Sequence, residues 1–167
     1  MAHIYFKNKY IALGIIGALI DLYGTTQSPA HLYFIAGAVA LLATAVHYRL
    51  VYFIALQLIL VAGHAAIIFG SGPYTQLALP VLLCIQLFIF YLMFGKENNI
   101  FLFLGICGIA LLSIGFTSSH EWPFFAGSLF VAIYSYYCGY KKQYPAYIWA
   151  VLNSIFSVFI LYRIYVF

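Results

Sequence analysis

Long apolar runs, interrupted by short polar turns, constrain the fold of this chain more than any other feature. Of its 167 residues, 66% are hydrophobic and 6% are charged, and the mean hydropathy is +1.06. A soluble domain needs about 25% charged residues to cover its surface. The sequence therefore predicts a polytopic membrane protein that places its apolar surface in lipid.

Seven of these runs are candidate membrane-spanning helices. The turns between them carry glycine, proline or clusters of polar residues, which end helices. Residues 1–9 form a short basic lead before the first span. We predict an all-α fold with one transmembrane domain over residues 1–167 and helix ends placed to about three residues. The predicted spans are residues 10–23, 29–48, 51–69, 74–94, 100–116, 123–140 and 146–167.

The basic residues support the count of seven spans independently. With that count, the amino terminus and the turns after the second, fourth and sixth spans share one side of the membrane. Six of the seven Lys and Arg residues lie there, whereas Arg163 lies inside the last span. This asymmetry predicts a cytoplasmic amino terminus, and we place the chain in a bacterial inner membrane. The six residues are Lys7, Lys9, Arg49, Lys96, Lys141 and Lys142.

The composition also excludes several kinds of site. The net charge of +4 is spread along the chain as a topology signal, so we expect no nucleic-acid partner. The cysteines stand singly and no two histidines are four residues apart, so we expect neither a metal nor a redox motif. No Gly-x-Ser-x-Gly motif is present. We expect no cofactor, and membrane lipid as a partner.

A weak internal repeat divides the chain. Residues 13–17 read Leu-Gly-Ile-Ile-Gly, and residues 104–108 read Leu-Gly-Ile-Cys-Gly. Each motif is followed by a polar loop, a proline, an Ala-Gly pair and a basic turn. The pattern predicts three spans, a linker span and three more spans, a parallel plan known among transporters. The alternative is chance, because glycine is common where membrane helices pack closely.

Polar groups at membrane depth are the candidates for a site, because ionisable groups are costly there. Gln57 and His64 share one face of the third span, and Asn153 and Ser157 share one face of the last. The alternative role for all four is interhelical hydrogen bonding, worth about 0.6 kcal/mol each. Asp21 is a candidate proton or cation site, but its place two residues from a span end favours contact with interfacial water.

Short motifs also follow one another in an order known from an enzyme family. They are Lys9, Gly37, Tyr52-Phe53, His64, Phe69-Gly70, residues 126–130 and the turn at residues 142–145. This order resembles the YhhN-type lysoplasmalogenases, small multi-span hydrolases that cleave the vinyl-ether bond of lysoplasmalogens. The resemblance implies a divergent member that hydrolyses or binds a lysolipid in a pocket open to the cytoplasmic side.

The chain lacks the two aspartates of that family. Their places fall near Thr44-Ala45 and Ser135-Tyr136. Vinyl-ether hydrolysis begins with protonation of the double bond and so needs a general acid. His47 is the replacement acid beside the first place, although it is also suited to be a solvated interfacial residue. The resemblance makes His64 and Ser135 substrate-binding candidates, in addition to Gln57, which is a candidate for its place in the third span. Whether the chain is an enzyme is left open.

A second pattern consists of the internal repeat, the run at residues 121–124, and the pair Trp149 and Asn153. It resembles the three-plus-one-plus-three transporters of the SWEET and PnuC type. The resemblance implies that Trp149 stacks on, and Asn153 hydrogen-bonds, a small polar solute such as a sugar, nucleoside or vitamin. Ile54 and Leu58 take the corresponding places in the first half. A non-catalytic scaffold is a third hypothesis, and a homodimer is left open.

Overall fold

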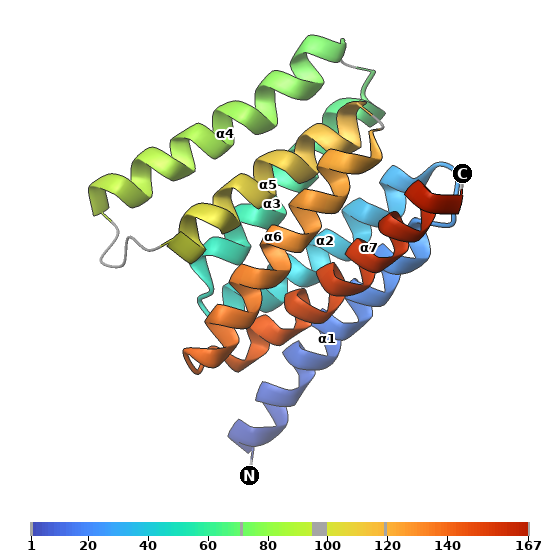
Figure 1. Cartoon of the computed structure of the whole chain (residues 1–167). Helices are drawn as coiled ribbons and strands as arrows, with labels where there is room; N and C mark the ends of the chain where they lie inside the picture. The colour runs from blue at the N-terminus through green and yellow to red at the C-terminus, as the bar shows by residue number, and fades with distance from the viewer. Residues whose placement is uncertain (1, 71, 95–99, 119, 167) are drawn as a thin grey trace.

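The structure, a computed structural model, describes residues 2–70, 72–94, 100–118 and 120–166 and is helical throughout its length (Figure 1). These residues form seven α-helices and one short 3-10 helix. The elements are α1 Ala2–Gly24, α2 Ala30–His47, α3 Val51–Ile68, α4 Pro73–Phe94, α5 Ile100–Ser118, α6 Glu121–Tyr140, η1 Tyr144–Ala146 and α7 Tyr147–Val166.

The helix ends confirm the apolar runs as the helical units. From α2 onward, each end lies within two residues of its predicted position. The exception is α1, which begins at Ala2 and not at Tyr10. Residues 2–9 contain neither glycine nor proline, so the helix continues through the basic lead. Lys96 lies outside the described residues.

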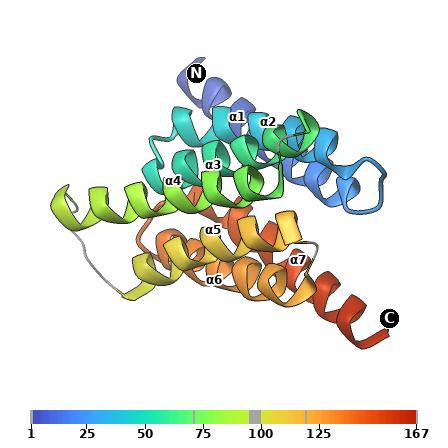
Figure 2. The same cartoon turned by 90° about the horizontal axis from the view of Figure 1, so that it is seen from above.

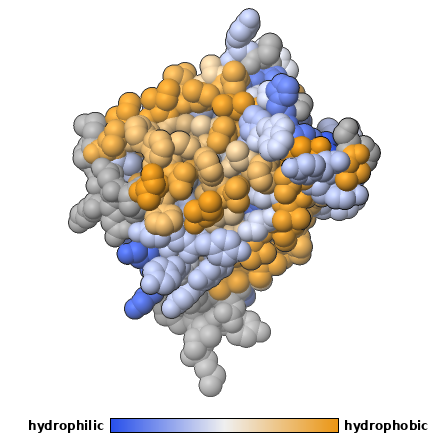
Figure 3. Space-filling view, in the orientation of Figure 1, coloured by the Kyte–Doolittle hydropathy of each residue, from blue (hydrophilic) through white to orange (hydrophobic). Residues whose placement is uncertain are grey.

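Several helices are suited to a membrane. Four segments are long and apolar enough to cross one, namely α2, α3, α5, and η1 with α7. Large apolar side chains such as Leu19, Val39 and Val158 are more than half exposed. Figure 3 shows a broad apolar band across one face, with hydrophilic residues gathered toward its two ends. Exposed apolar surface of this extent fits a lipid environment.

The helices form two groups of three that are joined by α4. In the first unit α2 packs between α1 and α3, and in the second unit α6 packs between α5 and α7. The units meet where α3 contacts α5 and where α1 contacts α7, which closes a ring of six helices. Figure 2 shows the two units on opposite sides, with α4 packed against α3 and α5.

A glycine contact brings the first two helices of each unit together. A Cβ on Gly17 would lie 2.8 Å from the carbonyl oxygen of Gly37, and a Cβ on Gly108 would lie 3.0 Å from that of Gly127. Contacts this short leave no room for a side chain, so glycine is what allows these helices to pack closely. All four glycines belong to the motifs of the sequence repeat.

The middle helix of each unit also ends in the same type of turn. Arg49 after α2 and Lys142 after α6 have φ values of 56° and 70°. The amide of Leu50 donates to the carbonyl of Ala45 at 2.9 Å, and in the second unit the next amide after Lys142 makes the equivalent bond at 3.0 Å. This is the Schellman arrangement, in which a left-handed residue ends a helix.

Candidate functional site

A polar cavity lies inside the ring, between the two units. Its volume is about 30 Å³, which is space for about two water molecules. Every helix of the ring contributes to its wall. We call it the central cavity, and its lining residues are Asp21, Phe34, Ala38, Leu56, Gln57, Leu60, His64, Leu112, Phe116, Phe124, Trp149, Leu152, Asn153 and Phe156.

Three buried polar atoms on this wall have no hydrogen-bond partner among the described residues. They are the carboxylate Oδ1 of Asp21, the amide Oε1 of Gln57 and the indole Nε1 of Trp149. The three residues are 8%, 2% and 0% exposed. An unsatisfied buried group costs about 1–3 kcal/mol, so three on one wall indicate that a ligand or water completes the site. An ionised Asp21 and Gln57 offer acceptors, and Trp149 offers a donor.

The close packing of α1 against α2 positions Asp21. Its carboxylate contacts Gly37, in the space that a Cβ on residue 37 would fill. Asp21 therefore lies buried in the wall of the central cavity, and the interfacial position that the sequence favoured is wrong. A signal was present in the sequence, because Asp21 follows Gly17 by four residues and so lies on the same packed face of the helix.

His64 reaches the cavity from α3 and contacts a second histidine. Its Nδ1 lies 3.2 Å from Nδ1 of His31 on α2, a hydrogen bond whose donor depends on the tautomers. The ring of Phe34 stacks on the imidazole at 5.1 Å, and the ring of Phe116 meets it edge-on at 4.4 Å. His31 is partly buried in the first turn of α2. The sequence analysis missed it because it lies at the very start of its span.

An open cleft of about 240 Å³ adjoins the central cavity. Phe34, Phe116 and Phe124 line both spaces, and Phe116 meets the other two rings edge-on at 5.1 and 4.5 Å. We call these three residues the phenylalanine partition. In the outer wall, Arg163 pairs with Glu121 at 2.7 Å. The remaining lining residues of this Glu121 cleft are Thr25, Ala30, Gly115, His120 and Ile160.

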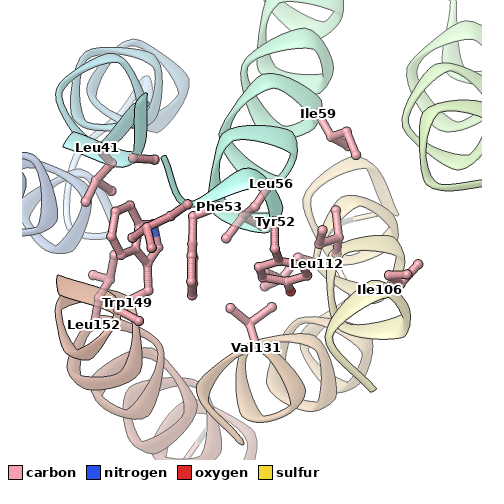
Figure 4. Close-up of a cluster of buried hydrophobic side chains, with 14 of the residues drawn as sticks. Leu41, Tyr52, Phe53, Leu56, Ile59, Ile106, Leu112, Val131, Trp149 and Leu152 are labelled. Atoms are coloured by element: carbon pink, nitrogen blue, oxygen red, sulfur yellow. The ribbon is translucent and has the colours of Figure 1, made fainter. Parts of the chain in front are cut away.

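The Glu121 cleft lies at the end of the bundle away from the basic turns, where α1 and α5 end and α2 and α6 begin. The sequence interpretation placed the opening of the pocket at the basic side. Toward that side, the rings of Phe53 and Trp149 close the cavity, with centroids 4.5 Å apart (Figure 4). An apolar crevice of about 290 Å³ also lies near the basic side, between α4 and α5.

The structure brings four of the predicted binding residues together. Gln57, His64, Trp149 and Asn153 all line the central cavity, although they come from two helices that are far apart in the sequence. The Asn153 amide Nδ2 donates to the carbonyl of Trp149 at 2.9 Å, which fixes its side chain against its own helix. Gln57, His64 and Asn153 were chosen from the sequence as polar residues deep within a span. In the structure, this criterion selects residues that meet at the central cavity.

The other two predicted site residues lie elsewhere. Ser135 is buried, its hydroxyl donates to the carbonyl of Val131 at 2.6 Å, and it lines neither space. His47 is the last residue of α2 and is exposed, with its ring stacked on Tyr10 at 3.8 Å. Neither residue lines the central cavity or the Glu121 cleft.

Corresponding residues of the two units meet at the cavity. Gln57 and Asn153 are each the seventh residue of their helices, α3 and α7. Phe53 and Trp149, which stack on each other, are each the third. An aromatic residue and an amide one turn apart therefore recur in both units. Two further pairs follow the same correspondence, namely Leu56 with Leu152 and Leu60 with Phe156. Phe34 and Phe124 also match, because each lies three residues before the glycine of an Ala-Gly pair.

From the sequence, Trp149 and Asn153 were matched with Ile54 and Leu58 of the first unit. The structure matches them with Phe53 and Gln57, so the sequence interpretation is wrong by one residue. Leu58 is 51% exposed and faces away from the cavity. The turns before the two helices differ in length, since α7 begins five residues after the left-handed Lys142, with η1 between them, whereas α3 begins two after Arg49. One residue of error rotates a helix position by about 100°.

Comparisons of the chain with protein-family models, with curated proteins and with solved structures gave no match. Within the described part of the chain, no three His, Cys, Asp or Glu side chains come together as a metal site requires. The function is therefore inferred from the central cavity, its two closures and its unsatisfied polar atoms.

Proposed function

We propose that this protein is a membrane carrier for a small polar solute, with seven spans in a three-plus-one-plus-three arrangement. One observation carries the proposal. The central cavity lies between two similar three-helix units and is lined by corresponding residues of both. In transporters built from repeated units, the substrate site lies near the midplane at the interface between the repeats.

Two shared features support a duplication of the three-helix unit. The glycine contacts of α1 with α2 and of α5 with α6 use the same motif positions. The left-handed residues Arg49 and Lys142 then end the middle helices in the same way. One helix, α4, links the two three-helix units. A single linker span gives both units the same orientation in the membrane.

The proposed topology places all seven helices across the bilayer. Lys9, near the start of α1, and the turns with Arg49, Lys141 and Lys142 then share one side, which the positive-inside rule makes cytoplasmic. The Glu121 cleft opens on the opposite side in this arrangement. A solute would enter the cleft, pass the phenylalanine partition and reach the central cavity.

Closure at both ends of the cavity fits a carrier that alternates between two openings. The phenylalanine partition closes one end, and the stacked Phe53 and Trp149 close the other. Rocking of one three-helix unit against the other opens one closure at a time. The cavity of about 30 Å³ has space for about two waters, so a solute enters only when a closure separates.

The two tryptophans of the chain allow a direct test of solute binding. Trp122 is 59% exposed, so Trp122→Phe leaves the buried Trp149 as a fluorescent reporter in the cavity wall. We expect one of three probes, D-glucose, uridine or thiamine, to change Trp149 emission saturably and to enter proteoliposomes. Gln57→Ala and Asn153→Ala should each raise the Kd about tenfold, the effect of losing one buried hydrogen bond.

The matched control for Gln57→Ala is Gln86→Ala, because Gln86 is exposed on α4 and lines neither space. The control should bind and transport like the parent. Unchanged Trp149 emission with all three probes, together with uptake equal to that of protein-free vesicles, would contradict the carrier proposal for these solute classes.

A lysolipid hydrolase is the second candidate, and one observation favours it. Asp21 supplies the cavity with a buried carboxyl, the type of general acid that His47 does not provide from its exposed position. Purified protein incubated with a lysoplasmalogen should then release aldehyde, and Asp21→Asn should abolish release whereas His47→Ala should not. Aldehyde no greater than in a heat-killed sample would remove this candidate.

A further inference from the structure

We propose that protons enter the central cavity through His31 and His64 and that Asp21 receives them. The use of this route, which is to couple solute movement to proton movement, rests on the proposed carrier function. The route itself rests on separate contacts. His31 and His64 hydrogen-bond through their Nδ1 atoms, and His64 and Asp21 line the same small cavity.

The histidine pair crosses the phenylalanine partition. On one side, His31 is partly exposed in the first turn of α2, next to Ala30 in the wall of the Glu121 cleft. On the other side, His64 is 2% exposed and lines the central cavity. Phe34 and Phe116 pack against the ring of His64. The apolar rings therefore exclude solute, while the imidazoles leave a hydrogen-bonded path between the two sides.

An imidazole pair in this contact can pass one proton without keeping it. In the starting tautomers His31 carries its proton on Nδ1 and His64 on Nε2, an assignment that the hydrogen bond permits. His31 accepts a proton on Nε2 and releases its Nδ1 proton to Nδ1 of His64. His64 then releases its Nε2 proton into the cavity. One proton has moved, and both rings are again neutral with exchanged tautomers.

Asp21 is suited to receive that proton. Its Oδ1 has no hydrogen-bond partner within the described structure, and the carboxylate is buried. The cavity that it shares with His64 holds about two waters, which suffice to carry a proton between the groups. Chains of His and acidic residues of this kind are typical proton relays in transporters.

The other charged groups near this route are few and paired. Among the described residues that line the two spaces, α4 and α5 contribute no titratable group. The loop before α6 contributes His120, and Glu121 of α6 pairs with Arg163 of α7 at 2.7 Å. In the central cavity itself, Asp21 and His64 are the titratable groups of the described wall.

A pH-jump experiment on the Trp122→Phe protein in nanodiscs tests the route. Trp149 shares the cavity wall with Asp21, so its emission should change when Asp21 gains a proton. We expect a single kinetic phase after the jump. Asp21→Asn should abolish its amplitude. His31→Phe and His64→Phe should keep most of the amplitude but slow the phase roughly tenfold to a hundredfold, as loss of a positioned proton-transfer group predicts.

Two controls separate this role from a structural one. His47→Phe removes an exposed histidine at the other end of the bundle and should leave the rate unchanged. Imidazole added to the buffer should restore the rate of His31→Ala, because His31 is partly exposed at the start of α2, next to a residue of the cleft wall. Full amplitude in Asp21→Asn, parental rates in both histidine variants, or no pH response in the parent would each overturn the route.

The same protein distinguishes this inference from the carrier proposal. Solute titration of Trp149 emission at constant pH tests the carrier, and the pH jump without solute tests the route. If the probes bind but the pH jump gives no phase, the proton route fails and the carrier stands. If the phase is present and no probe binds or enters vesicles, the route stands and the carrier proposal fails.

Discussion

The two three-helix units share a scaffold and differ in the chemistry that they bring to the cavity. Their glycine contacts, helix-ending turns and aromatic–amide pairs correspond. The titratable residues of the cavity wall do not. Asp21 and His64 of the first unit correspond to Leu112 and Ile160 of the second, both of which are apolar. The residues that correspond in the two units therefore form most of the cavity wall. Asp21 and His64, whose counterparts are not titratable, are the ones to which we assign the proton chemistry.

The contacts near the Glu121 cleft show the same division. His31 and Glu121 take equivalent places, five residues before the Ala-Gly pairs of α2 and α6. Each links its middle helix to the third helix of its unit, His31 through a nearly buried His64 and Glu121 through the 45% exposed side chain of Arg163. The first contact leads into the cavity, whereas the second stays in its outer wall.

The largest expected loss of stability follows from removing Phe53 or Trp149, the aromatic pair in contact between the two units. Trp149→Ala and Phe53→Ala should each lower the free energy of unfolding by about 3–5 kcal/mol, because each leaves a cavity in a fully packed core. Both side chains are at most 1% exposed. Thermal unfolding in detergent, followed by circular dichroism, measures the effect. Trp122→Ala, at an exposed position, should cost less than about 0.5 kcal/mol.

Next in size is the glycine contact of each unit. Gly37→Ala and Gly127→Ala should each destabilise the protein by about 1–3 kcal/mol through overpacking, since the new Cβ atoms would lie 2.7 and 2.9 Å from the facing glycine carbonyl oxygens. Gly72→Ala is the control, with no atom within 4 Å of its Cβ. Equal melting temperatures for all three variants would show that the units are not held by these contacts.

Replacing Asp21 by the residue of the second unit should stabilise the protein. Asp21→Leu removes an unpartnered buried polar group and should raise the free energy of unfolding by about 1–3 kcal/mol, while the pH response of Trp149 is lost. The converse change, Leu112→Asp, should destabilise the protein. A lower melting temperature for Asp21→Leu would mean that the carboxylate has a stabilising partner in the folded state.

The smallest effect concerns the Glu121–Arg163 pair. Glu121 and Arg163 side chains are 32% and 45% exposed, so a double-mutant cycle with Glu121→Gln and Arg163→Gln should give a coupling energy of about 0.2–1 kcal/mol. The coupling should weaken as salt is added. A coupling energy above this range that does not fall with salt would contradict this expectation. It would show that the Glu121–Arg163 pair is shielded from solvent, as His64 of the first unit is.

Much of the fold could be predicted from the sequence. Apolar runs and glycine or proline turns placed the helix ends, since both features act locally. The start of α1 was predicted wrongly, because residues 2–9 contain no residue that stops a helix and the helix continues through them. The register of the repeat was wrong by one residue, because the turns before α3 and α7 differ in length and in the presence of η1, which the sequence motifs do not report.

The candidate site was predicted in part. Gln57 and Asn153 were selected for depth in their spans, and depth correlates with burial in a ring of helices. His47 and Ser135 were selected by resemblance and lie outside the cavity. Asp21 was judged by its distance from a span end, yet its burial depends on a neighbouring helix that approaches at Gly37. The spacing of four residues from Gly17 indicates the packed face of α1 but not the helix that covers it.

The position of Asp21 against Gly37 has a consequence for sequence variation. The carboxylate occupies the volume of the missing Cβ, so these two sites are sterically linked. A variant lineage that acquires alanine at residue 37 must first shorten or displace the residue at 21. In an alignment of relatives, the two columns should therefore vary together, with glycine at residue 37 wherever residue 21 keeps a side chain as long as aspartate.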